Sequence, residues 1–208
     1  MTSEQRERDE MLHDMEHSAF RYFVHEVNEA NGLVPDKTEP GWPASIAATG
    51  MALTIYPIGV ERGFMTRETA LRRSLVTLRF LMNSEQSTSP RATGYKGFYY
   101  HFLDLQTGRR AWSCELSSID TALLMAGVLA ARHYFQGEEA DERELRGLAE
   151  ALYARVDWPW MQAGGPALCH GWKPRSGFLR FHWLGYDEAL ILYVLARFTH
   201  PPGDAAGL

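Results

Sequence analysis

The sequence predicts an all-α fold in which helices alternate with loops, with two short β-hairpins at one end. Apolar residues recur at helical spacing through most of the 208 residues. Two segments break this pattern, because aromatic residues crowd them and turn residues interrupt them. Each of these segments leads into an apolar helix that begins near a carboxylate.

The helical pattern divides into six segments. The predicted helices cover 4–29, 44–60, a stretch that begins after Thr66, 117–136, 141–156 and 185–198. Segment 44–60 is apolar on nearly every side, which predicts a helix buried all round. Thr66 is the expected N-cap of the third helix, with Glu68 in its first turn. Segment 85–96 is polar and predicts a loop.

The predicted hairpins lie near 97–112, "GFYYHFLDLQTGRRAW", and near 170–183. In the first, Asp104 and Thr107-Gly108 supply the turn. The two hairpin regions resemble each other weakly, since "GFYYHF…CELSSIDTALL" and "GFLRFHWLGYDEALIL" both pass from Gly-Phe through aromatics and His to a carboxylate. Repeated helix pairs with decorated loops at one end indicate an α/α toroid. Six helices suggest one partial domain over residues 1–208, about half of such a ring.

Composition narrows the class of protein. The net charge of −5 and the absence of a basic block argue against nucleic-acid binding. No signal peptide or membrane-spanning run is visible, so the chain as written is expected to be cytoplasmic. Cys114 and Cys169 lack metal-ligand spacing and leave a single disulfide open. His101 and His182 lie in aromatic segments and are expected to pack or to form hydrogen bonds rather than to bind a metal, so neither a metal nor a cofactor is expected.

Two carboxylates stand out at the starts of apolar helices. Glu115 precedes the expected cap at Ser117 or Ser118 and follows Trp112, and a carboxyl among aromatics suits a general acid with a raised pKa. Asp120 is equally well explained as a residue of the helix N-terminus. Glu188 has the same relation to the last helix, whereas Asp187 beside it is interpreted as a helix-terminal charge. Two such carboxylates among aromatic residues are the minimal equipment for hydrolysing a glycosidic bond.

Ordered blocks along the chain resemble the bacterial glycoamylase-like family of glycoside hydrolases, which includes endo-β-1,2-glucanases and a domain of cyclic β-1,2-glucan synthases. The blocks are "FRYF", "ASIAATGMAL", "PIGVERGFMTRETA", "TLRFL", "GFYYHFLDLQTGRRAW", "ELSSIDTALLMAG", "YFQG", "DWPWM" and "GYDEALILYVLA". They extend from about Phe20 to His200. The resemblance implies an (α/α)6 toroid and, for some members, a periplasmic location.

The resemblance also implies a sugar cleft. Its catalytic carboxylates would be Glu115 and Glu188, in an order that the sequence leaves open, and its mechanism would be inverting. Asp104 and Asp120 would contact the sugar. The aromatic lining would comprise Tyr99, Tyr100, His101, Trp112, Trp172, Trp183 and Tyr186. Family members continue with further helices after "THP", whereas this chain ends "THPPGDAAGL", so the second half of the ring is expected to be missing.

The leading hypothesis is therefore a glycoside hydrolase that acts on an oligo- or polysaccharide, a β-glucan with β-1,2 linkages. The alternative is a non-catalytic carbohydrate-binding or assembly module derived from the same fold. A third reading, isoprenoid chemistry on an α/α toroid, is disfavoured because the sequence has no DDxxD-like cluster. An open ring would expose apolar helix faces, which predicts self-association or a need for the missing half.

Overall fold

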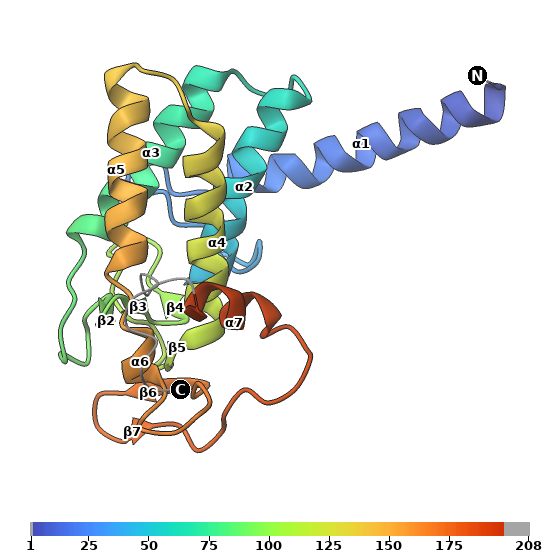
Figure 1. Cartoon of the computed structure of the whole chain (residues 1–208). Helices are drawn as coiled ribbons and strands as arrows, with labels where there is room; N and C mark the ends of the chain where they lie inside the picture. The colour runs from blue at the N-terminus through green and yellow to red at the C-terminus, as the bar shows by residue number, and fades with distance from the viewer. Residues whose placement is uncertain (1, 198–208) are drawn as a thin grey trace.

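The computed structural model describes residues 2–197, and Figure 1 shows how their helices are arranged. Met1 and residues 198–208, which include Phe198 at the end of the last predicted helix and the polar tail, lie outside the described residues. The helices are α1 (Ser3–His25), α2 (Ile46–Glu61), α3 (Arg67–Asn83), α4 (Ser118–Tyr134), α5 (Ala140–Ala154), α6 (Trp158–Met161) and α7 (Leu190–Arg197). The strands are very short, so the predicted all-α class is confirmed.

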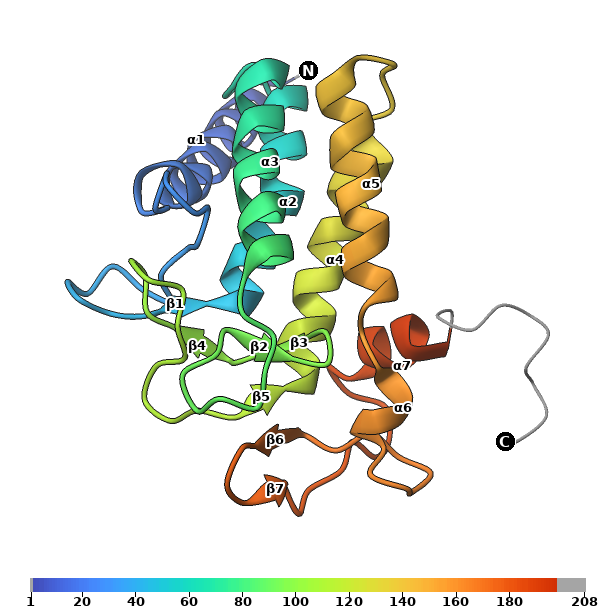
Figure 2. The ribbon, with the colours of Figure 1, turned by 90° about the vertical axis from the view of Figure 1, so that its left-hand side faces the viewer.

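The helices form two rows. In the first row α2 packs on α4 and α4 packs on α7, while in the second row α3 packs on α5. The second row covers the first through the contacts of α3 with α2 and of α5 with α4 (Figure 2). Helix α1 leaves this body and extends outward, and Phe20 is its one buried residue (Figure 1). Two rows of paired helices are the arrangement that the sequence predicted for an arc of a toroid.

Two glycines allow α2 and α4 to cross with their backbones almost in contact. A Cβ atom at Gly127 would lie 1.9 Å from the carbonyl oxygen of Gly50, and a Cβ at Gly50 would lie 2.6 Å from the Cα of Leu124. Any side chain at either position would push the helices apart. This crossing fixes the spacing between the N-terminal ends of α2 and α4.

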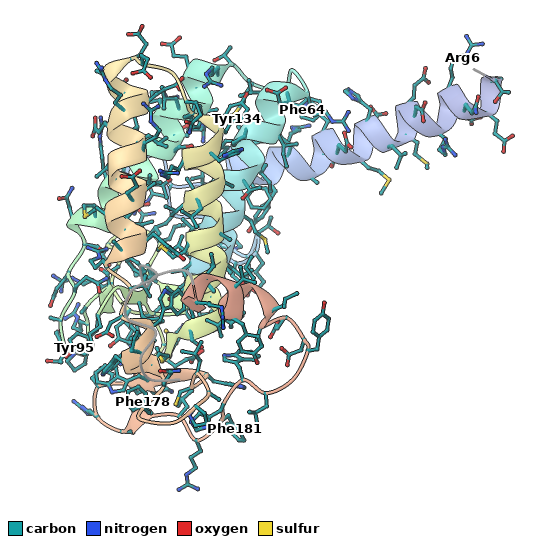
Figure 3. The ribbon with its side chains drawn as sticks, in the orientation of Figure 1. Arg6, Phe64, Tyr95, Tyr134, Phe178 and Phe181 are labelled. Carbon is teal, nitrogen blue, oxygen red and sulfur yellow. The ribbon has the colours of Figure 1, made fainter. Side chains whose placement is uncertain are left out.

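All the strands lie at that end of the bundle (Figure 2). Each pairing is antiparallel: β1 (Ala44–Ser45) with β4 (Phe102–Leu103), β2 (Gly94–Tyr95) with β3 (Phe98–Tyr99), and β5 (Leu116–Ser117) with β6 (Gly171–Lys173), which also pairs with β7 (Gly177–Phe178). Figure 3 shows Tyr95, Phe178 and Phe181 at this end, whereas Phe64 and Tyr134 lie at the other. The strands therefore gather the loops that precede the helices of the first row.

One predicted hairpin is confirmed and the other is paired differently. The hairpin near 170–183 is present as β6 and β7. At the start of segment 97–112, β3 pairs with the preceding strand β2 rather than with a later strand. Lys96 and Gly97, with φ values of 54° and 82°, form the two-residue turn between them. The expected pairing within 97–112 survives as the isolated bridge between Leu103 and Arg110.

Two further expectations need correction. The last helix begins at Leu190 rather than 185, after Asp187 accepts a hydrogen bond from the backbone N–H of Ala189. The helix predicted over 44–60 is not buried all round, because Met51 and Ile58 are about half exposed. The sequence left a disulfide between Cys114 and Cys169 open, and in the structure both are free thiols. Within residues 2–197, no helix combines the length and the apolar composition that crossing a membrane requires.

Candidate active site

A histidine lies between two carboxylates at the N-terminus of α4. Nδ1 of His101 lies 2.9 Å from Oε1 of Glu115, and its Nε2 lies 3.7 Å from Oδ1 of Asp120. The side chains of His101 and Glu115 are 31% and 27% exposed, and that of Asp120 is 13% exposed. Glu115 is therefore the carboxylate that solvent reaches more easily, and Asp120 lies beneath it.

Backbone hydrogen bonds hold these residues together. The N–H of His101 donates to the carbonyl of Glu115 at 3.0 Å, and the carbonyl of His101 accepts from the N–H of Ile46 in the first turn of α2 at 3.2 Å. On the other side, Leu116 pairs with Trp172. Gly171 also lies against Glu115, since a Cβ there would be 3.1 Å from Cγ of Glu115. Glu115 is thus held between the segment of His101 and strand β6.

The three groups shift one another's proton affinity. The hydrogen bond from His101 lowers the pKa of Glu115, although partial burial opposes this effect. Burial raises the pKa of Asp120, against the attraction of His101 and the hydrogen bond from Ser117. Burial alone would lower the pKa of His101, but the hydrogen bond with Glu115 and the charge of Asp120 raise it. The expected raised pKa of Glu115 is therefore wrong in direction, and the carboxyl with the raised pKa is Asp120.

The N-termini of α2 and α4 are built alike, as two copies of one capping arrangement. Their comparison shows which residues the cap requires. Ser45 and Ser117 are N-caps with φ near −96° and −95°, and Thr49 and Thr121 donate to the carbonyls of Ser45 and Ser117. At the third residue after the cap, α2 has Ala48 where α4 has Asp120.

The predicted cap role of Asp120 is present, since Ser117 Oγ accepts from its N–H and donates to its carboxylate at 2.5 Å. Two residues before its N-cap, α2 has Pro43, whereas α4 has Glu115 at the same position. Because α2 is capped by Ser45 without either acid, a cap of this kind requires neither Glu115 nor Asp120, although Asp120 takes part in the cap of α4.

The predicted aromatic residues divide into surface and supporting positions. Trp112 and Tyr186 are 59% and 89% exposed. Trp172 is half-buried and contacts Tyr95, with a distance of 5.4 Å between the ring centroids. Trp183 stacks on His170 at 4.0 Å and donates its indole N–H to Ser118 at the start of α4.

Two predicted contact residues are buried in the core, and a third, Asp104, holds its own turn. Tyr99 and Tyr100 are fully buried, and the hydroxyl of Tyr99 donates to the carbonyl of Leu81. Their rings belong to the core because β3 directs this stretch under the helices. Asp104 caps its own turn, since its carboxylate accepts from both the N–H and the hydroxyl of Thr107 at 2.7 Å. These bonds lower the pKa of Asp104.

Glu188 is exposed and precedes α7. Within the described residues, no hydrogen bond or ion pair holds its side chain, in contrast to Glu115. Asp187 binds the N–H of Ala189, which agrees with its interpretation as a helix-terminal charge. The pairing of Glu188 with Glu115 across one cleft stays a prediction.

Sequence reasoning missed Trp42, which contacts Trp112 edge to face with a distance of 4.8 Å between the ring centroids. The surrounding "EPGWPAS" indicates a loop and offers no signal of that contact. It also missed His170, whose carbonyl accepts from Ser118 as that of His101 accepts from Ile46. In the described part of the chain, no three His, Cys, Asp or Glu side chains are grouped so that they could hold a metal ion.

The chain is similar in sequence and in fold to known proteins. No protein-family model matches the sequence. An exo-β-1,2-glucooligosaccharide sophorohydrolase (non-reducing end) of Parabacteroides distasonis is 31% identical over an alignment of 199 residues, and the alignment covers 90% of this chain and 26% of that protein. The crystal structure of a β-1,2-glucanase from the same species superposes with a TM-score of 0.80 and 29% identity, over 90% of this chain and 27% of that one.

The chain is a homologue of these β-1,2-glucan hydrolases. A glucoamylase-like protein of Bacteroides uniformis has the same fold, with a TM-score of 0.80 and 26% identity over 90% of this chain and 46% of that one. The predicted resemblance and the toroid-type fold are confirmed. This chain spans about half the length of the Bacteroides uniformis protein and about a quarter of the length of the Parabacteroides proteins.

Proposed function

We propose that this chain acts in the hydrolysis of β-glucan, and specifically of β-1,2-linked glucose units. The observation that carries the proposal is Glu115, a partly exposed carboxylate that His101 holds at the mouth of α4. The homology to β-1,2-glucan hydrolases supplies the substrate class. Exposed Trp112 and Tyr186 at the same end of the molecule offer ring faces for stacking on the sugar.

The chemistry follows from the charge of Glu115. A carboxylate with a lowered pKa is ionised near neutral pH, which suits the base that takes a proton from the attacking water. The water oxygen then bonds to the anomeric carbon while the glycosidic C–O bond breaks. A second carboxylic acid protonates the departing oxygen, and we assign that role to Glu188. Inversion requires about 6.5–9.5 Å between the two carboxyl groups, enough for one water.

Turnover by the purified chain tests this proposal. With β-1,2-gluco-oligosaccharides as substrate, we expect Glu115→Gln and Glu188→Gln each to lower kcat by about 100-fold or more, because general acid–base catalysis contributes about 10²–10⁴-fold. Asp187→Asn is the matched control and should have a mild effect, since Asp187 caps the turn before α7. NMR of the first product should show the α-anomer if the β-linkage is cleaved with inversion.

The outcomes separate the enzyme from the binding module. Loss of turnover in both glutamine variants with unchanged thermal unfolding supports the two-carboxylate mechanism. Full activity in either variant would remove that residue from the reaction. Binding of β-1,2-glucan without turnover by the unmodified chain would instead indicate a carbohydrate-binding module.

A further inference from the structure

A strip of aromatic rings leads away from the histidine of the candidate site. His101 stacks on Phe102 with 3.9 Å between the ring centroids and 13° between the planes. Phe102 contacts Trp112 at 5.2 Å, and Trp112 contacts Trp42 at 4.8 Å. Lys37 ends the strip, with its ammonium 3.6 Å from the centre of the Trp42 ring. The strip joins three separate segments, the loop around Lys37 and Trp42, strand β4, and the loop before β5.

Trp112 is presented to solvent by a strained backbone. Trp112 and Ser113 have φ values of 51° and 54°, a conformation that costs free energy for residues other than glycine. Arg110 holds this turn by donating to the carbonyls of Ser113 and Cys114. The strain is not offset by burial in the core, because Trp112 is 59% exposed. A strained turn that exposes a large aromatic ring beside a candidate active site points to ligand binding.

Trp42 supplies a second, less exposed ring, and its indole N–H is free to donate a hydrogen bond. Its indole N–H is buried and has no hydrogen-bond partner among the described residues. Lys37 also pairs with Glu39 at 2.9 Å, so an ammonium and a carboxylate stand at the end of the strip. Pyranose rings combine apolar C–H faces, which stack on indole, with hydroxyls that such groups bind.

We propose that Trp112 and Trp42, with Lys37 at the outer end, form a further sugar-binding position for a glucose unit of the β-glucan chain beyond the unit held at Glu115. This inference rests on the proposed function and extends it, because it predicts that the chain prefers longer oligosaccharides. The position belongs to the loop over residues 36–43 and the turn at Trp112, and it needs no movement of the helices.

The test is binding without turnover. In the Glu115→Gln background, calorimetry measures the affinity for β-1,2-linked oligosaccharides of increasing length. We expect the affinity of this parent to rise with length, and Trp112→Ala to remove about tenfold for long oligosaccharides, the scale of one aromatic stacking contact plus its buried area. The disaccharide should bind this variant as it binds the parent. Trp112→Phe should restore most of the lost affinity, and Lys37→Met should lower it less than Trp112→Ala.

A matched control separates recognition from general damage. Phe181 is 71% exposed at the same end of the molecule but lies outside the strip (Figure 3), so Phe181→Ala should change no affinity. Equal affinities of the parent and Trp112→Ala for every length would overturn the proposed position. An equal loss for the disaccharide and for long oligosaccharides would also overturn it, since the strip would then only support the unit at Glu115. If the Glu115→Gln parent binds none of the β-1,2-linked oligosaccharides, whatever their length, the proposed function is wrong and so is this inference.

Discussion

His101 is the residue on which the electrostatics of the candidate site depend. Because its pKa in the folded chain is raised, the protonated ring stabilises the fold fully below the pKa of an unfolded histidine, about 6.5, and this contribution is lost as the pH rises through the folded-state value. We therefore expect His101→Gln to lower the free energy of unfolding more at about pH 5.5 than at about pH 8.5. Urea unfolding at both pH values measures the difference.

His133→Gln is the control for this prediction, since His133 is exposed near the far end of α4. An equal effect of His101→Gln at both pH values would mean that Glu115 and Asp120 do not stabilise the protonated ring. NMR titration of His101 should also show a lower midpoint in Glu115→Gln than in the unmodified chain.

At the same scale, sequence reasoning located the acids but not their environment. Glu115 and Asp120 stand out because they flank the start of an apolar helix, which is a local pattern. The pKa of Glu115 is lowered by His101, and that of Asp120 is raised by burial. His101 reaches both acids through the pairing of Tyr100 with Leu116, sixteen residues apart in a bridge that no local pattern encodes. Tyr99 and Tyr100 were misplaced for the same reason, because the direction of β3 decides which aromatics are buried.

At the scale of elements, the crossing of α2 and α4 sets the position of the candidate site. Gly127→Ala should destabilise the chain by about 3 kcal/mol or more, because its Cβ would overlap the backbone of Gly50 and overpacking of a tight contact has costs of this order. Gly147→Ala is the matched control. It lies in α5 with open space around the new Cβ, so it should stabilise the chain by about 0.5–1 kcal/mol. Chemical denaturation measures both, and similar effects would show that the crossing is not tight in solution.

Helix starts were more predictable than strand partners. Thr66 caps its helix as expected, and of the two candidates Ser117 and Ser118 it is Ser117 that caps α4, since an N-cap is recognised within four residues of sequence. The strands are two or three residues long, so their partners follow from how the helices place the loops. For this reason Ala44 of β1 pairs with Leu103 of β4, although 58 residues lie between them. The expected hairpin over 97–112 is reduced to one bridge.

At the scale of the whole molecule, the helix rows confirm the predicted arc, while the exposed faces of α1 and α7 raise the question of association. Met11, Leu12 and Met15 lie on α1 where it extends from the body, and they are 56%, 48% and 61% exposed (Figure 1). On α7, Leu190 and Val194 are 43% and 45% exposed. On α1, whose other exposed residues are mostly charged or polar, apolar side chains at helical spacing indicate a surface that gains free energy when covered.

We expect the purified chain to self-associate through α1. Burying a methionine or leucine side chain contributes about 1.5–3 kcal/mol, so three neighbours on one helix can hold two chains together at high concentration. Light scattering should show a mass that rises with concentration. Replacing Met11 and Met15 together by Gln, which preserves helix propensity, should keep the mass at one chain. Arg6→Gln, at the tip of the same helix (Figure 3), should leave the association unchanged. If the unmodified chain keeps the mass of one chain at every concentration, the exposed face of α1 does not drive association.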